Sequence, residues 1–401
     1  MYRLLPLSML LASGCLGPFE AASGPSPSDT APDDTGPDPV DTAAPEPTIV
    51  DVTESITADT TWTNDNVYVL AEDGLIYVEG EATLTIEEGT TVRGLPGSAL
   101  IVTRDAMIDA NGDPDQPIVF TSAQPVGQRK PGDWGGVVLL GNDEVNKSIP
   151  RQIEGVSLED EPRAQYGGSD TFDNCGSMDY VRIEFAGFEL FDGVDGNDLN
   201  GLTLGGCGVN TRIRHVQVHR GFDDGVEVFG GSVDLKWIVI SGALDDSLDW
   251  DEGWDGRAQF VVIQQYENPD PTIANVGDEG IEGDGALGDD EDLDGLRDVQ
   301  EPFTFPTLTN VSIFGSGAKG TRHNAMDLRE GTGARMMNML IGRQTGHGVD
   351  LTDPQTAIWA SNTTPGEPTV SITHSVFFDV GDGGNQYGVS ATLDQNGEGQ
   401  A

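Results

Sequence analysis

Basic side chains are scarce in this sequence of 401 residues. Only 20 Lys and Arg stand against 68 Asp and Glu, which gives a formal net charge of −48. A surface of this charge repels polyanions, so we expect neither nucleic acid nor an anionic membrane surface to be bound through charge. Cationic partners are favoured instead, and Ca²⁺ in particular.

Long apolar runs and helical periodicity are also lacking. No stretch keeps a 3.6-residue apolar period, so helices are expected to be at most incidental. Short apolar runs recur between Gly, Asn and Asp turns, a pattern typical of β-strands. Examples are VYVL from Val67, ALIV from Ala99, LKWIVI from Leu235 and TVSITHSVFF from Thr369.

The N-terminal stretch MYRLLPLSMLLASGCLGP is typical of a secretory signal. Its apolar run is shorter than the about 20 residues of a membrane-spanning helix. Small residues directly precede Cys15, which is similar to the bacterial lipobox, so residues 1–14 are predicted to be cleaved and Cys15 to be lipidated. This predicts an exported bacterial lipoprotein of the outer membrane or cell surface. The alternative is an ordinary signal peptide with an incidental cysteine.

Residues 15–48 are predicted to be a disordered linker. From Ala21 to Thr48 the chain has no aromatic residue and one Val, too little apolar surface to offset the entropy of ordering. Its Pro content favours a semi-extended spacer. We expect the folded part to span residues 49–385, with an acidic insertion around 278–303, and a C-terminal tail at 386–401.

One phrase recurs in the folded part: FDDGVEVF begins at Phe222 and LDDSLDWD at Leu244, a return of 22 residues. Among a sandwich, a propeller and a parallel solenoid, this period fits one coil of a parallel β-helix, because a propeller blade needs about 40 residues. In this register Val226 and Val228, then Leu248 and Trp250, point inward.

A small residue before an apolar, acidic, apolar triplet continues the repeat. Its acids are Glu227, Asp249, Glu282, Asp327 and Asp350, separated by 22, 33, 45 and 23 residues. Two of these steps are single coils, and the other two carry insertions or skip a coil.

The chain resembles a family of uncharacterised secreted bacterial right-handed β-helix proteins with the pectin-lyase-like fold. The segments that carry this resemblance include GDWGG at 132–136, the FDDG…FGG block at 222–231, MDYVRIEFAG and LNGLTLGGCG. It covers roughly residues 55 to 345 and implies an all-β, single-stranded right-handed parallel β-helix at the cell surface. It implies no reaction, so no catalytic residues are transferred.

The segment DEDLDGLRDVQE, residues 290–301, matches the calcium-loop pattern, with Gly at the sixth position for a sharp turn. The predicted Ca²⁺ ligands are Asp290, Asp292, Asp294, the carbonyl of Leu296, Asp298 and Glu301. The alternative is a solvated acidic loop inserted between coils.

The acids of the repeated phrase form a second, weaker candidate for a cation or an acidic glycan. They are Asp223, Asp224, Glu227, Asp245, Asp246 and Asp249. Carboxylates stacked ~4.8 Å apart repel by about 1 kcal/mol in water, which a divalent cation would reverse. The alternative is a solvated outer face of the scaffold.

Cys175 and Cys207 remain after lipidation and lie 32 residues apart, close to one coil with a small insertion. Oxidation is permitted in an exported chain. This predicts a disulfide between adjacent turns, with two buried free thiols as the alternative.

Two function classes stay open. The first is a lipid-anchored, calcium-stabilised scaffold, adhesin or glycan-binding module, whose partners are the membrane, a polysaccharide or another surface protein. The second is a polysaccharide lyase or glycoside hydrolase acting on an acidic polysaccharide. A lyase needs a base, for which Arg220 is the nearest candidate, and a hydrolase needs paired carboxyls. The five histidines, His215, His219, His323, His347 and His374, show no zinc-ligand spacing.

Lipidation can be tested at Cys15. The variant Cys15→Ser removes the acceptor thiol, so we expect an unprocessed protein or one that no longer partitions with membranes. Immunoblots of membrane and soluble fractions measure both size and location. A cleaved Cys15→Ser protein that stays in the membrane fraction would contradict the lipobox interpretation.

Overall fold

The computed structural model describes residues 47–156, 161–189, 198–267, 279–291, 297–317, 324–361, 369–381 and 389–391. Residues 47–401 form one compact unit, and residues 1–46 are assigned to a separate unit that lies outside the described residues. Among the described residues no helix is long and apolar enough to cross a bilayer.

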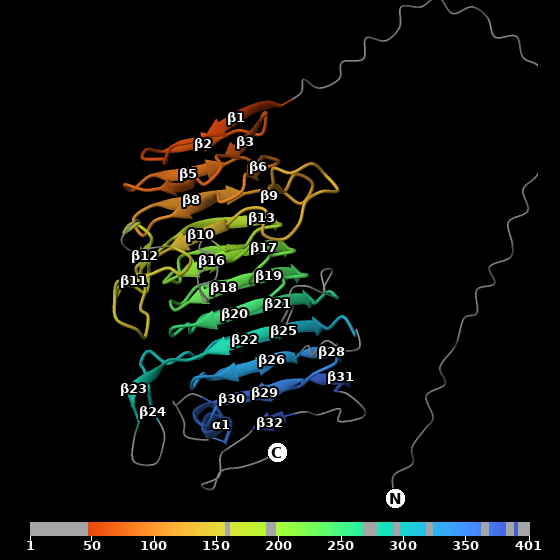
Figure 1. Ribbon diagram of the computed structural model, residues 1–401. Coiled ribbons are helices and arrows are strands. Elements are labelled where there is room, and N and C mark those ends of the chain that lie inside the picture. Colours follow the sequence, from red (N-terminus) through yellow and green to blue (C-terminus); the bar gives the residue numbers. More distant parts are fainter. Residues whose placement is uncertain are drawn as a thin grey trace, which may run out of the picture. The chain divides into compact units, whose positions relative to one another are not determined.

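Two parallel sheets carry most of the chain, and their strands follow one another coil by coil down the stack (Figure 1). The 16-stranded sheet contains β1 (Thr48–Val52), β2 (Thr60–Trp62), β3 (Asn66–Leu70), β5 (Thr83–Ile86), β6 (Thr91–Gly94), β8 (Met107–Asn111), β9 (Ile118–Ser122), β13 (Gly176–Glu184), β17 (Arg212–His219), β19 (Asp234–Ser241), β21 (Arg257–Gln264), β25 (Thr307–Phe314), β27 (Ala334–Met337), β28 (Leu340–Gln344), β30 (Val370–Thr373) and β31 (Val376–Val380).

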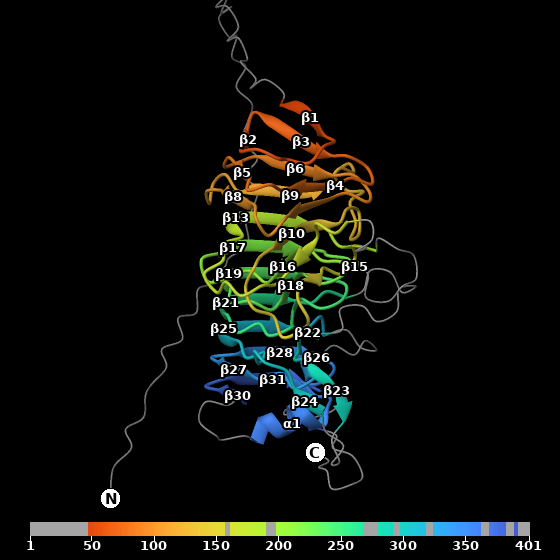
Figure 2. The same cartoon turned by 90° about the vertical axis from the view of Figure 1, so that its left-hand side faces the viewer.

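The 10-stranded sheet closes the other side of each coil, and Figure 2 shows its strands in the same stacking order. It contains β4 (Leu75–Val78), β7 (Ala99–Val102), β10 (Gly136–Leu140), β16 (Leu202–Gly205), β18 (Val226–Phe229), β20 (Leu248–Asp251), β22 (Glu279–Asp284), β26 (Asn324–Arg329), β29 (Val349–Leu351) and β32 (Val389–Ala391).

The alternation of side chains within each strand builds the core. Val226 and Val228 pair in register with Leu248 and Trp250, and all four side chains are buried in one apolar core cluster. This confirms the inward positions predicted from the repeated phrase. Because parallel strands in register place like residues above one another, each coil repeats the apolar column of the last.

Five long strands of the larger sheet bend near their middle. The residues at the bends are Tyr180, His215, Trp237, Phe260 and Asn310, all with positive φ. In β13, residues before the bend pair with β8 and residues after it pair with β9, so the bend joins two flat runs of strands into one sheet. Each coil therefore has three straight sides and one sharp corner within the 16-stranded sheet.

The GDWGG motif at 132–136 fills the core beneath the early coils. Trp134 is fully buried and its indole N–H donates to the carbonyl of Glu184 at 2.9 Å. A Cβ on Gly136, whose φ is 114°, would lie 2.1 Å from the carbonyl oxygen of Asn200. The motif thus combines a large core side chain with a close backbone approach between coils.

Several excursions leave the coils. Antiparallel pairs join β11 (Arg151–Gln152) with β12 (Gln165–Tyr166), β14 (Phe188–Glu189) with β15 (Asp198–Leu199), and β23 (Leu287–Glu291) with β24 (Arg297–Val299). The described residues contain one helix, α1 (Pro354–Ser361). Strand β32 lies inside the 386–401 segment that the sequence analysis assigned to a tail, and it pairs in parallel with β29. A run of three residues is too short for a sequence pattern to identify.

The predicted disulfide between Cys175 and Cys207 is present, with a Cα–Cα distance of 5.8 Å, and both residues are buried. Cys207 follows β16, and Cys175 directly precedes β13 on the preceding coil. The bridge therefore fixes the point where the excursion between β10 and β13 returns to the helix.

We predict that the double variant Cys175→Ala with Cys207→Ala loses about 3–4 kcal/mol of unfolding free energy, as the chain-entropy model gives for a loop of this size. Denaturant unfolding of wild type and variant, both without reductant, measures the difference. Wild type unfolded and refolded with reductant is the control and should match the variant. Two alkylated thiols at positions 175 and 207 of the oxidised protein would contradict the bridge.

Candidate metal centre

One outward-facing column of the 10-stranded sheet changes from uncharged to acidic residues along the stack. Ile101, Val138 and Thr203 occupy one register position in β7, β10 and β16. The same position holds Glu227, Asp249, Glu282, Asp327 and Asp350 in the next five strands of the sheet. The repeat steps of 33 and 45 residues are therefore single coils with insertions, and no coil is skipped.

The excursion between β10 and β13 covers part of this outer face. Val145, Ile153 and Tyr166 of the excursion belong to a second apolar cluster that also contains Ile101 and Val138 of the sheet. Further along, Arg151 pairs with Glu252 at 2.5 Å, and the Tyr166 hydroxyl donates to the same carboxylate at 2.7 Å. The excursion thus contacts the outer face from β7 to Glu252, the residue that follows β20.

Four of the acids in the repeated phrase are buried. The exposed fractions are 6% for Asp224 and Glu227, 4% for Asp246 and 8% for Asp249. The expectation of a solvated outer face is therefore wrong for these four side chains. The period predicted correctly which face these acids occupy. It could not predict their burial, because the excursion that covers part of this face is not part of the repeat.

A hydrogen-bonded ladder runs through the residues that precede these strands. The side-chain oxygen of Asn200 accepts the backbone N–H of Asp224 at 3.1 Å, and that of Asp224 accepts the N–H of Asp246 at 2.8 Å. Asp246 in turn accepts the N–H of Glu279 at 2.8 Å. Since neutral Asn200 makes the same bond, the ladder needs only an acceptor oxygen, and the charges of Asp224 and Asp246 need another explanation.

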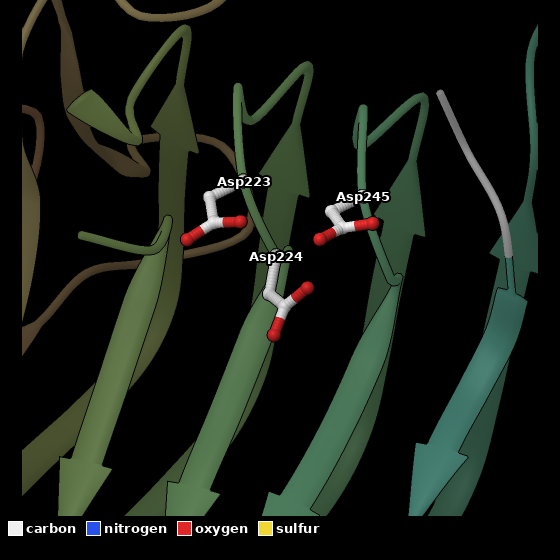
Figure 3. A group of neighbouring side chains, drawn as sticks. All are labelled: Asp223, Asp224 and Asp245. Atoms are coloured by element: carbon white, nitrogen blue, oxygen red, sulfur yellow. The ribbon is translucent and has the colours of Figure 1, made fainter. Parts of the chain in front are cut away.

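The acids border a cavity of about 310 Å³. All six residues that the sequence analysis grouped line it, and Figure 3 shows three of their carboxylates at the turns that lead into β18 and β20. The full lining is Glu154, Asp223, Asp224, Glu227, Phe229, Asp245, Asp246, Asp249, Asp251, Glu282, Asp284 and Arg329. Ten carboxyl groups thus share this cavity with one guanidinium.

The distances between carboxylates suit a divalent cation. One oxygen from each member of a triplet lies within 4.8 Å of the others in Asp223, Asp224 and Asp245, again in Asp224, Glu227 and Asp249, and again in Asp246, Glu279 and Glu282. Ca²⁺ takes oxygen ligands at about 2.3–2.6 Å, so two oxygens on opposite sides of one ion are about 4.6–5.2 Å apart. Each triplet therefore supplies three ligand positions for Ca²⁺.

Asp249 provides a second, independent indication. Its Oδ1 atom is buried and has no hydrogen-bond partner, in a side chain that lines the cavity. A buried carboxylate oxygen without a partner loses several kcal/mol of hydration that nothing replaces. A cation in the cavity would restore that interaction.

Burial dominates the electrostatics of the cavity. It raises the pKa of Asp224, Glu227, Asp246 and Asp249 well above the ordinary range, and neighbouring carboxylates raise each pKa further. Burial raises the pKa of Glu282 to about 8, with Asp284 adding to the shift. Burial also raises the pKa of Asp284, to about 6, although the hydrogen bond from Arg329 opposes the shift. Without a cation, several of these groups hold protons at neutral pH.

Sequence reasoning missed four of the charged residues around the cavity. Asp251, Asp284 and Arg329 each lie two positions after an acid of the repeat, so strand alternation places them on the same outward face. Arg329 pairs with Glu282 at 2.5 Å and with Asp284 at 2.7 Å. Glu154 comes from the covering excursion, and nothing in the repeat points to it.

None of the other predicted site residues that the structure describes lines this cavity. Of the proposed calcium loop, Asp290 lies in β23, Asp298 lies in β24 and Glu301 precedes a cis peptide bond to Pro302. Asp292, Asp294 and Leu296 lie outside the described residues, as does Cys15. Arg220 lines a different pocket, together with Arg129, Arg182 and His219.

We predict that the metal-free protein loses stability as pH rises from 7 to 8.5. Carboxyls with a raised pKa, such as Asp251 and Glu282 at about 8, bind protons in the folded state that the unfolded state releases. Each such proton lowers the unfolding free energy by about 1.4 kcal/mol per pH unit as long as the folded state holds it, and the slope levels off above the folded-state pKa.

Denaturant unfolding in chelator at several pH values measures this slope. The double variant Asp224→Asn with Asp246→Asn keeps both ladder acceptors and removes two carboxyls, so it should show a shallower slope than wild type. A flat or rising stability of the metal-free wild type between pH 7 and 8.5 would contradict the prediction.

The match to a family model agrees with this architecture. Residues 54–394 match the family described as pectate-lyase-like beta helix domain. A match among solved structures is the crystal structure of the periplasmic alginate epimerase AlgG, with 10% sequence identity, a TM-score of 0.25, and coverage of 80% of this chain and 77% of that chain. No curated protein sequence matches. With the family match covering most of its length, the chain belongs to the pectate-lyase-like beta helix domain family.

Proposed function

We propose that this protein is a calcium-binding, surface-anchored β-helix that holds an acidic polysaccharide through protein-bound Ca²⁺. The observation that carries the proposal is the unpartnered Oδ1 of buried Asp249 in a cavity lined by ten carboxyl groups. A scaffold alone gains nothing from such an atom, because burial without a partner is destabilising. A bound cation makes the same atom a ligand.

The ladder supports the assignment of the charges to a ligand. At Asn200 and Asn324 the chain uses a neutral side chain to accept the N–H of the next coil, and at Asp224 and Asp246 it uses a carboxylate for the same bond. Only one oxygen of each carboxylate is needed for the ladder. The second oxygen and the negative charge are then available to a cation.

Calcium suits this cavity better than magnesium. Ca²⁺ accepts six to eight oxygen ligands in irregular arrangements, whereas Mg²⁺ demands a small octahedron and keeps several waters. Three neighbouring triplets of carboxylates, with no nitrogen or sulfur ligand in any of them, match the oxygen preference of Ca²⁺. The loop at 290–301 is proposed as a separate Ca²⁺ site that stabilises the insertion.

An acidic polysaccharide is the partner that this chemistry favours. Calcium bound by protein carboxylates retains coordination positions that glycan carboxylates can fill, so the ion bridges two negatively charged surfaces that otherwise repel. Without the ion the carboxylates that line this cavity repel the same polymer. Binding through this site therefore depends on Ca²⁺.

The anchor and location are proposed from the sequence and the disulfide. Cys15 would carry the lipid, and the Pro-rich segment that follows would hold the β-helix away from the membrane. The buried disulfide is in keeping with an oxidising compartment outside the cytoplasm. The cell surface or outer membrane gives access to extracellular polysaccharide.

Hydrolysis of the polysaccharide is the second candidate function. Glu282, with a pKa of about 8, would stay protonated at neutral pH as a general acid requires, and ionised carboxylates lie in the same cavity. A lyase is less favoured, because Asp284 pairs with Arg329 and holds it protonated, so Arg329 cannot accept a proton. Release of reducing ends from polygalacturonate, or their absence, separates hydrolysis from binding.

The calcium site is tested in an Asp292→Ala background, which silences the loop at 290–301. We expect Ca²⁺ at 100 times its dissociation constant to stabilise this protein by about 2.7 kcal/mol. Adding Asp224→Asn and Asp249→Asn should abolish the stabilisation and raise the stability of the metal-free protein at pH 8. Thermal unfolding and calorimetric titration with CaCl₂ measure both effects.

The matched control is Glu81→Gln with Glu88→Gln, which removes two exposed turn carboxylates far along the stack. This variant should respond to Ca²⁺ as its Asp292→Ala parent does. Calcium-dependent retention of polygalacturonate should follow the same pattern. Full calcium stabilisation of the Asp224→Asn, Asp249→Asn protein would refute the site.

A further inference from the structure

A stack of aromatic rings lies at the corner of the 16-stranded sheet, on strands that follow one another in Figure 1 (β13, β17, β19 and β21). Ring centroids are 4.2 Å apart between Tyr180 and His215, 4.4 Å between His215 and Trp237, and 6.0 Å between Trp237 and Phe260. All three pairs are stacked within 10°. These residues occupy the positive-φ bends, so the stack is fixed by the backbone register.

The stack borders an open groove of about 540 Å³. Its apolar wall remains accessible: the exposed fractions are 37% for Trp237, 41% for Phe260 and 42% for Val262. Asn310 takes the next bend position after Phe260 and also lines the groove, as do the polar side chains of Gln217 and Ser312. The groove therefore combines a flat apolar wall with hydrogen-bonding groups over several coils.

Two cations lie in register beside the stack. Arg214 in β17 pairs directly with Lys236 in β19, and both line a neighbouring cavity of about 340 Å³. The Lys236 Nζ lies 4.5 Å from the centroid of the Trp237 ring. Within the described part of the chain, neither Arg214 nor Lys236 forms an ion pair, whereas Arg257 on the next coil pairs with Asp234.

Two adjacent positive side chains are unusual in a chain this acidic. Like charges directly opposite on adjacent strands destabilise a sheet. With 68 acidic residues against 20 basic ones, a carboxylate partner is abundant in the sequence. Asp179 lies opposite Arg214 on β13, but it pairs with Arg212 and His215 instead. An anion from outside would therefore be favoured at Arg214 and Lys236.

We propose that this groove, the corner groove, is a second glycan site that binds an acidic polysaccharide directly and without calcium. The polymer runs along the stack, its apolar C–H surfaces against Trp237, Phe260 and Val262, and its carboxylates paired with Arg214 and Lys236. Coils repeat every ~4.8 Å, comparable to the length of one sugar unit in an extended chain. Successive sugars thus meet successive coils.

The chemistry selects this partner over other polyanions. Nucleic acid carries one phosphate per about 1.7 Å of duplex axis, a several-fold higher charge density than one carboxylate per ~4.8 Å sugar unit, so the net charge of −48 repels it more strongly. An acidic, Pro-rich peptide could also contact aromatic side chains, and residues 21–48 of this chain have that composition. The experiment therefore includes that segment as a competing occupant.

Binding is measured on the full chain by retardation in gels that contain polygalacturonate or, as the neutral control polymer, dextran. Chelator is present throughout, so that no calcium-dependent binding contributes. We expect retardation by polygalacturonate alone. Arg214→Gln with Lys236→Gln should weaken it at least tenfold. Phe260→Ala should weaken it as well, and all variants should retain the unfolding midpoint of wild type within a few degrees.

The control variant is Lys130→Gln with Arg343→Gln, which makes the same change in net charge at exposed positions outside the groove. It should bind as wild type does. Equal retardation of the Arg214, Lys236 variant and wild type, equal retardation by dextran, or no retardation of wild type would each overturn the proposal. So would binding of a synthetic 21–48 peptide at these two cations without binding of the polysaccharide. Failure in chelator leaves the calcium-dependent function untouched, so the two proposals fail separately.

Discussion

In-register stacking of parallel coils is the constraint on which the rest of this structure depends. Equivalent residues of adjacent coils lie ~4.8 Å apart, so whatever the repeat places at one position it places beside itself. Apolar residues benefit, and the core column from Val226 through Leu248 is buried throughout. Charged residues are destabilised by stacking, because each charge lies next to a charge of the same sign on the adjacent coil.

The protein meets this constraint differently at two places. On the 10-stranded sheet Asp224, Glu227, Asp246 and Asp249 are buried, and Glu154 of the excursion whose return is held by the Cys175–Cys207 disulfide lines the same cavity. At the corner of the larger sheet, Arg214 and Lys236 repeat a positive charge beside an aromatic stack that remains accessible. The first arrangement is the proposed site of a divalent cation, and the second is the proposed site of an acidic polysaccharide.

Much of the scaffold could be predicted from the sequence because stacking is local and periodic. A 22-residue return, inward Val226 and Trp250, and the pairing of Cys175 with Cys207 all follow from coil length alone. The site was predicted as a set of six residues, and its burial was not. Glu154 reaches it from outside the repeat, and the period of one coil contains no information about a chain segment that crosses several coils. The aromatic stack was missed for a similar reason, since Tyr180, His215, Trp237 and Phe260 share geometry but not residue type.

The ladder of Asn200, Asp224 and Asp246 separates the charge of the surface from the stability of the fold. Either amide or carboxylate completes the same backbone bond, so each rung can be charged or neutral without altering the coil. Such a solenoid can gain, lose or shift an ion site by one coil through a single-atom exchange in a side chain. The charge at each coil can therefore differ between related solenoids while the backbone fold stays the same.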